Sequence, residues 1–160
     1  MKLLTKLFHI SPILLIATMF IPSCSKISDN GDLDGKWHLI EMYSKNTPTE
    51  ASYTQKHETY GKGIYWMFQL DLLNIITREI PENVYSRDII ARFNHSGNQL
   101  HITETYVHFR ERDSLLTDPS TTLLEPVGIR GNATTFNIKE LNSSKMILTS
   151  PFDSLVFKKK

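Results

Sequence analysis

From residue 35 onward, apolar and polar side chains alternate along the chain with a period of two, which is typical of strands that bury one face. In the first such segment, Trp37 and Leu39 share a face with Glu41, and the residues between them face the other way. Residues 64–76 form the most apolar stretch of this part of the chain. Their aromatic and β-branched side chains and the glycines before them favour one long strand over a helix.

Further strand-like runs follow at short intervals, with turn-forming residues between them. They span residues 84–95, 100–109, 134–141, 145–149 and 154–158. Two segments depart from this pattern. The polar residues 44–62 predict a long loop, and within residues 113–129 the pair Asp118-Pro119 predicts a short helix that ends at Gly128. Seven or eight short strands separated by turns predict an all-β protein, either an antiparallel barrel or a sandwich, with one short helix.

The composition mainly excludes other classes of protein and site. A chain of 160 residues, 40% hydrophobic and 22% charged, is suited to one globular domain. Its single cysteine excludes an internal disulfide and a cysteine zinc site. The net charge of +1 lacks the basic excess that nucleic-acid binding requires, so no nucleic acid is expected as a partner.

The N-terminal 23 residues are typical of a secretory signal peptide. Lys2 and Lys6 precede an apolar stretch at residues 10–21, and no acidic residue occurs there. The stretch is short and contains Pro12, so it is unsuited to a stable bilayer span.

This segment ends in Ile21-Pro22-Ser23-Cys24, which resembles the lipobox of bacterial lipoproteins. The resemblance implies that the Cys24 thiol receives a diacylglycerol, that the chain is cleaved after Ser23, and that a further acyl chain such as palmitate caps the new terminus. Several acyl chains hold a protein on a membrane almost permanently. We therefore expect a cleaved signal peptide (1–23), a lipidated cysteine with a flexible tether (24–34) and a barrel domain (35–160) at the cell outer membrane, on either its periplasmic or its surface face.

The sequence Gly35-Lys36-Trp37, just after the tether, resembles the opening of lipocalins. Together with the lipobox and the last two strand-like runs, it is similar to lipocalin-like lipoproteins of gut-dwelling Gram-negative bacteria. The resemblance implies an up-and-down antiparallel barrel of eight strands in which Trp37 closes the narrow end. It also implies that Lys158 packs over that ring and that residues 44–62 cover the opening of the calyx.

Aromatic side chains on the expected strands are the main sign of a binding site. An eight-stranded barrel has room for packed side chains or for one small ligand. The candidate ligand-binding residues are Trp37, Glu41, Trp66, Phe68 and Glu104.

The two carboxylates are candidates because each lies in register with an apolar neighbour. Glu41 follows Leu39, and Glu104 follows Ile102, so each is expected to point inward. A carboxylate inside an apolar calyx is costly unless it is paired, and Arg92 is a candidate partner. The alternative is that both carboxylates lie at a rim or bulge that is open to water.

Motifs for chemistry are not found. The histidines after Cys24 form no H-x-H or H-E-x-x-H spacing, and there is no nucleophile elbow or glycine-rich phosphate loop. A partial match to a calcium loop, from Asn30 to Glu41, lacks a preceding helix and continues with strand alternation. We expect no enzyme activity, no metal and no cofactor.

Two functions remain open at this stage. In one, a lipid-anchored barrel binds a small amphipathic or apolar molecule in its calyx. In the other, the barrel is filled and the protein acts through a protein partner, as an inhibitor, an adhesion module or a complex subunit. A continuous cavity favours the first, whereas a dry interior with an exposed apolar patch favours the second.

Overall fold

The computed structural model describes residues 30–59, 61–78, 88–109 and 112–160. The expected signal peptide, the lipobox and Cys24 lie outside the described residues. Eight strands form the barrel: β1 (Gly35–Ser44), β3 (Tyr65–Gln69), β4 (Leu72–Ile76), β5 (Asp88–Ser96), β6 (Gln99–Phe109), β8 (Thr134–Leu141), β9 (Lys145–Thr149) and β10 (Asp153–Lys159). Two short strands, β2 (Gln55–His57) and β7 (Arg112–Leu115), lie outside it, and η2 (Gly31–Leu33) and η3 (Glu125–Val127) are 3-10 turns.

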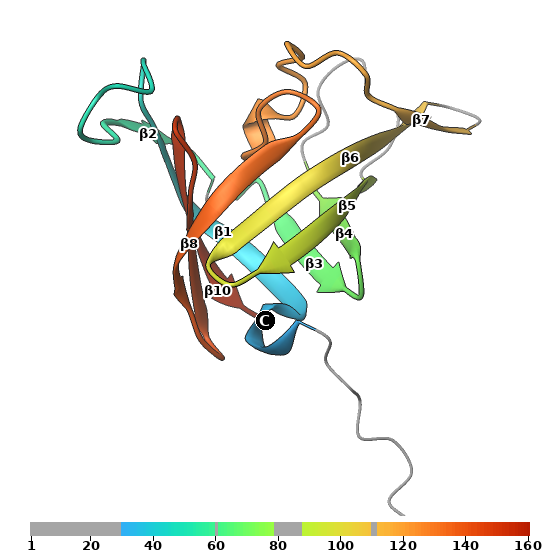
Figure 1. Ribbon diagram of the computed structural model, residues 1–160, viewed down its shortest axis with the longest axis horizontal. Coiled ribbons are helices and arrows are strands. Elements are labelled where there is room, and N and C mark those ends of the chain that lie inside the picture. The colour runs from blue at the N-terminus through green and yellow to red at the C-terminus, as the bar shows by residue number, and fades with distance from the viewer. Residues whose placement is uncertain (1–29, 60, 79–87, 110–111) are drawn as a thin grey trace, which may run out of the picture.

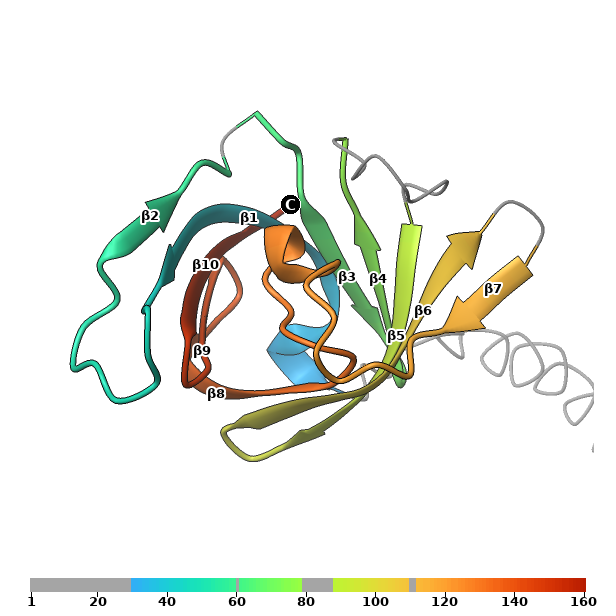
Figure 2. The same cartoon turned by 90° about the horizontal axis from the view of Figure 1, so that it is seen from above.

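Each barrel strand pairs antiparallel with the next one along the chain, and β10 pairs with β1 to close the ring (Figures 1 and 2). The predicted up-and-down barrel of eight strands is therefore confirmed. Along the edge of β6 that does not pair with β5, residues 99–102 pair with β8, whereas residues 106–109 pair with β7. The chain between β7 and β8 thus leaves the wall, and Figure 2 shows it crossing the inside of the ring of strands.

One end of the barrel is closed around Trp37. Its indole N–H donates a hydrogen bond of 2.7 Å to the carbonyl oxygen of Leu33 in η2, and both side chains are fully buried. The lysine that covers this ring is Lys159, whose Nζ lies 4.8 Å from the ring centroid, and not Lys158 as expected. The β1–β10 register explains the difference, because it pairs Trp37 with Lys159.

The core of the barrel is built around a second tryptophan. The Trp66 ring packs against Phe136 and Phe157, with centroids 5.9 and 5.1 Å apart, and against Phe68 at 6.1 Å. Inward-facing residues of all eight strands join this cluster, as the period-two alternation predicted. Removing one such ring typically costs about 3–5 kcal/mol, so the cluster is a major source of stability.

Three expectations about the elements were wrong. The long strand expected at residues 64–76 is the β3–β4 hairpin, because the chain turns at Leu70, whose φ is 56°. The helix expected from Asp118 is a 3-10 turn of three residues, although Gly128 does end it, with φ 92°. The loop at residues 44–62 contains β2, which pairs with the end of β1. No helix within the described ranges is long and apolar enough to cross a membrane.

We predict that Gly131→Ala destabilises the fold by roughly 3 kcal/mol. Gly131 has a φ of 68°, and a Cβ there would lie 2.4 Å from the backbone oxygen of Pro119. The matched control is Gly97→Ala, because Gly97 has a φ of 56° but nothing within 4 Å of its added Cβ. This control should lose only about 1 kcal/mol. Urea unfolding measures both, and equal losses would show that the close approach to Pro119 is unimportant.

Candidate ligand-binding site

The three aromatic residues proposed to line a calyx lie in the packed interior. Trp37 and Trp66 have no exposed surface, and Phe68 is 2% exposed. A side chain without exposed surface has no void beside it that is large enough to hold a water molecule. In this conformation the three rings are core residues, and a ligand would have to displace what covers them.

The cover over Trp66 is the strand-free chain between β7 and β8, residues 116–133, which we call the mouth segment. Its side chains Leu124, Val127 and Ile129 are buried in the hydrophobic core. The Trp66 indole N–H donates to the carbonyl oxygen of Val127 at 3.2 Å. The mouth segment therefore fills the barrel opening with apolar side chains, as a ligand would.

Arg130 attaches the mouth segment to the barrel rim. Its Nε donates to Oδ2 of Asp153 at 2.6 Å and its NH2 group to Oδ1 at 3.0 Å, while NH1 reaches Glu125 at 3.1 Å. Asp153 begins β10 and is 1% exposed, so this fork lies against a buried carboxylate. Hydrogen bonding to Asp153 and the two nearby carboxylates raise the pKa of Arg130, although burial opposes this shift. The guanidinium therefore stays charged, which bidentate pairing requires.

Ser44 and His57 extend this network on the other side of Asp153. The Ser44 hydroxyl lies 2.6 Å from Asp153 Oδ1 and 2.7 Å from His57 Nε2. A hydroxyl has one proton, and the carboxylate can only accept it, so His57 Nε2–H is the donor to Ser44. Serine thus lies between histidine and aspartate, whereas in a hydrolytic triad the imidazole lies between the other two. The arrangement joins β1, β2 and β10 at the rim.

Sequence reasoning missed this network, because its members are far apart along the chain and form no motif. Ser44, His57, Arg130 and Asp153 come from four separate elements. The available indication was that Asp153 opens a strand directly after a turn, where a short polar side chain is ordinary.

Glu41 does not point inward. A β-bulge between Leu39 and Glu41 shifts the register, so that Leu39 and Met42 face the core and Glu41 lies opposite Val156 on the outer side. The inward orientation is wrong and the alternative, a bulge position, is the one observed, because strict alternation does not survive an extra residue in a strand.

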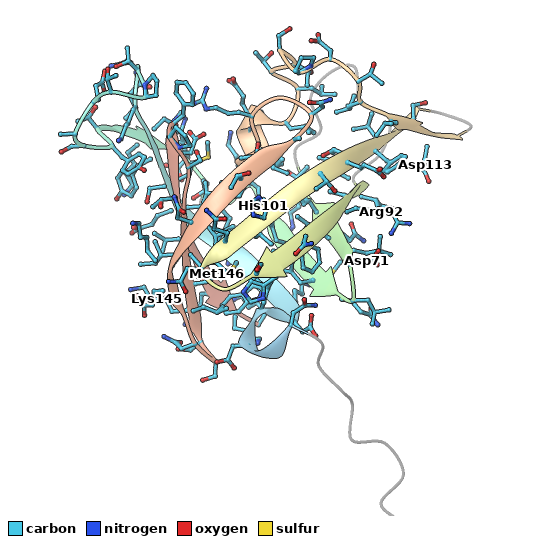
Figure 3. All side chains as sticks on the ribbon, in the orientation of Figure 1. Asp71, Arg92, His101, Asp113, Lys145 and Met146 are labelled. Atoms are coloured by element: carbon cyan, nitrogen blue, oxygen red, sulfur yellow. The ribbon has the colours of Figure 1, made fainter. Side chains whose placement is uncertain are left out.

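Glu104 also faces outward, next to a second bulge at Arg92 and Phe93. Its side chain is 46% exposed and accepts a hydrogen bond of 2.8 Å from the Tyr106 hydroxyl. Arg92, the candidate partner, does lie beside it, with Nε 3.8 Å from the carboxylate, and also pairs with Asp71 (Figure 3). Both partners are largely exposed, so the pair contributes little stability.

A separate concavity lies on the outer wall of the barrel, at the end closed by η2. It is an open groove of about 990 Å³, a volume in the range of small-molecule sites. Its lining joins the η2 region to the outer faces of β3, β4 and β5, and includes Lys36, Met67, Leu70, Leu72, Asn74 and Ile90. Among the described residues, no group of three His, Cys, Asp or Glu side chains is arranged to hold a metal ion.

The closed up-and-down ring of eight strands, with one end sealed at a tryptophan, defines a small lipocalin-like barrel. The chain belongs to the lipocalin-like domain family, whose model matches residues 17–160. No curated protein matches the chain.

Two solved structures share the fold. One is a lipocalin-like protein from Bacteroides uniformis, with a TM-score of 0.50 and 16% identity over 81% of this chain and 100% of that chain. The other is a protein from Bacteroides eggerthii, with a TM-score of 0.50 and 19% identity over 80% of this chain and 99% of that chain. At these identities the likeness concerns the fold alone.

We predict that Asp153→Asn loosens the mouth segment. Loss of the buried charge partner of Arg130 should cost about 2 kcal/mol of stability, less than for a fully buried pair because Arg130 is partly solvated. Amide hydrogen exchange should accelerate at residues 121–131 more than in β9. Arg92→Gln, which breaks an exposed pair, is the control and should change stability by less than about 0.5 kcal/mol. Unchanged exchange in Asp153→Asn would mean that apolar packing alone holds the segment.

Proposed function

We propose that the protein is a lipid-anchored lipoprotein of the cell envelope whose barrel binds a small amphipathic or apolar molecule without catalysing its conversion. The observation that carries this proposal is the mouth segment. An apolar interior is covered at its opening by chain that belongs to no strand, and one charged side chain attaches that cover to the rim. A ligand that enters the barrel would replace the apolar contacts that Leu124, Val127 and Ile129 make with the core.

The distribution of polar groups favours an amphipathic ligand. Wall positions in the barrel are mostly apolar, whereas three of the buried polar residues, Ser44, Thr149 and Asp153, lie at strand ends near the opening. The Arg130 guanidinium is at the same rim, with a third of its surface exposed. A molecule with an apolar body and an acidic or polar end group would place the end group beside Arg130.

A non-catalytic role is supported by the chemistry at the rim. Ser44 is buried and donates its proton to a carboxylate that Arg130 already pairs, so it is poorly placed to act as a nucleophile. His57 donates to Ser44 and does not withdraw its proton.

The anchor is supported by Ile21-Pro22-Ser23-Cys24 and by the polar composition of the chain that joins it to β1. Attachment at Cys24 would hold the closed end of the barrel toward the membrane, because η2 and the start of β1 lie at that end. The opening would then face away from the bilayer, and the outer membrane is the proposed location.

A second candidate function, a filled barrel that binds a protein partner, is favoured by one observation. The inward-facing side chains are almost entirely without exposed surface, whereas Leu115 on β7 is 45% exposed beside the mouth segment. An exposed leucine next to a packed interior fits a contact surface better than a calyx.

We predict that an environment-sensitive fatty-acid probe binds the chain, and that Asp153→Asn strengthens this binding about tenfold. Weakening the attachment of the mouth segment raises the population of the open state, and apparent affinity rises with that population. Fluorescence titration measures the dissociation constants, with Arg92→Gln as the control that should match the unaltered chain. Absence of binding by both the unaltered and the Asp153→Asn chains would favour the protein-partner candidate.

A second prediction concerns the anchor. The mature N-terminal peptide from the native envelope should begin at residue 24 and carry acyl chains, and Cys24→Ser should abolish both the cleavage and the lipid. Mass spectrometry of that peptide checks the expectation, together with fractionation of membranes. Ser25→Ala, which leaves the motif intact, should behave as the unaltered chain does. A mature chain that lacks acyl groups would contradict the anchor without bearing on ligand binding.

A further inference from the structure

The groove on the outer wall, which the calyx hypothesis does not use, has a regular floor. The β1–β3–β4–β5 register places Lys36, Met67, Asn74 and Ile90 side by side in one cross-strand row. Because alternate residues of a strand face opposite sides, this row lies on the outside while its neighbours Trp37, Trp66 and Ile75 face the core. The floor therefore carries two apolar side chains, Met67 and Ile90, with the Asn74 amide between them and the Lys36 ammonium group at one end.

One side of the groove is the β3–β4 turn, which departs from the usual chemistry of tight turns. Leu70 occupies its tip with a φ of 56° and is 58% exposed, and the next leucine, Leu72, is 41% exposed. A bulky residue in the left-handed region costs about 1 kcal/mol or more, and glycine or asparagine is the ordinary choice there. The Asn30 amide donates to the Leu70 carbonyl oxygen at 2.8 Å, which fixes the turn against the start of the barrel domain. Two leucines thus project from a held, strained turn into solvent.

Two polar side chains, Asn74 and Lys36, also line the groove. The Asn74 Oδ1 atom is buried and accepts no hydrogen bond within the described part of the chain. A buried acceptor without a donor is costly, so a ligand with an N–H or O–H group would gain by supplying one. Lys36, whose Nζ lies 4.3 Å from the centre of the Tyr65 ring, borders the same groove and suits an anionic group.

The length of chain before Asn30 indicates what reaches the groove. Six residue steps separate Asn30 from Cys24, and at 3.3–3.6 Å per step they span at most about 22 Å. Asn30 contacts the Leu70 turn directly, and the turn and η2 lie at the same end of the barrel in Figure 1. A barrel anchored at Cys24 therefore keeps Asn30, which contacts the Leu70 turn beside this groove, within about 22 Å of the bilayer surface.

We propose that the outer groove is a lipid site: Leu70 and Leu72 enter the surface of the bilayer, and the groove between them and Ile90 receives one acyl chain of a membrane lipid. Its headgroup would donate to Asn74 Oδ1 and place its phosphate near Lys36. This orientation rests on the anchor in the proposed function, but the affinity of the groove for lipid does not. A second copy of the chain is the rival occupant; the short tether favours the bilayer, because it keeps this face of the barrel near the membrane.

The test uses the mature chain, residues 24–160, with Cys24→Ser and therefore without lipid. All strands of the barrel lie within it. It should co-sediment with vesicles of phosphatidylethanolamine and phosphatidylglycerol at high lipid concentration. Leu70→Gly should weaken the partition coefficient about tenfold, the effect of withdrawing one half-exposed leucine from apolar surroundings. Its urea midpoint should stay the same or rise, because glycine accepts the left-handed conformation.

A matched pair of strand variants controls for general hydrophobicity. Leu72→Thr, within the groove, should weaken partitioning severalfold, whereas Leu115→Thr, on β7 outside the groove and of similar exposure, should partition as the unaltered chain does. Equal partitioning of these two variants, or no vesicle binding by the unlipidated chain, would overturn the proposal. So would a dimer in sedimentation velocity that Leu70→Gly dissociates while vesicle binding stays unchanged. None of these results depends on whether Cys24 is acylated in the cell, which the peptide mass determines separately.

Discussion

The pairing of β10 with β1 is the constraint on which the rest of the structure depends. It brings the last strand of the chain back to the first and removes the free edges that an open sheet of this size would expose. A closed ring has one inner and one outer face, so every strand must place its apolar residues on the same side. The register of that pairing also sets Lys159 over Trp37 and brings Asp153 to Ser44. The closed end and the polar network at the rim are therefore two consequences of one strand pairing.

Alternation in the sequence predicted an all-β barrel or sandwich, because the core requires period-two patterning over most of each strand and tolerates local exceptions. The resemblance to lipocalins then favoured the barrel. The wrong expectations arose where a strand departs from this alternation. Glu41 and Glu104 were expected to point inward, and both lie beside bulges that reverse their side. The turn at Leu70 was missed because no glycine, proline or asparagine marks it. Neither feature has a marker in the local sequence: the bulge at Glu41 is fixed by pairing with β10, and Asn30, which lies 40 residues away, holds the Leu70 turn.

The rim network was beyond sequence reasoning for a different reason. Ser44, His57, Arg130 and Asp153 are common residue types at unrelated positions, and their proximity follows from barrel closure together with the path of the mouth segment. The aromatic residues were visible in the sequence, but their surroundings were not. Trp66 and Phe68 face inward as expected, but composition cannot distinguish a ring that lines a cavity from one that another segment covers. The deciding segment, residues 116–133, has no strand pattern from which its position could be predicted.

The two ends of the barrel thus have different relations to water. At the open end, apolar side chains of the mouth segment pack against the interior. The free-energy cost of opening is the loss of those contacts and of the Arg130–Asp153 ion pair. At the closed end, the interior is sealed by Leu33 and Trp37, yet leucines remain on the outside. Burial inside the barrel cannot account for Leu70 or Leu72, because the strands that carry them already supply Phe68 and Leu73 to the core. Their exposed side chains are therefore available for contact with an apolar environment outside the barrel, as the proposed lipid site requires.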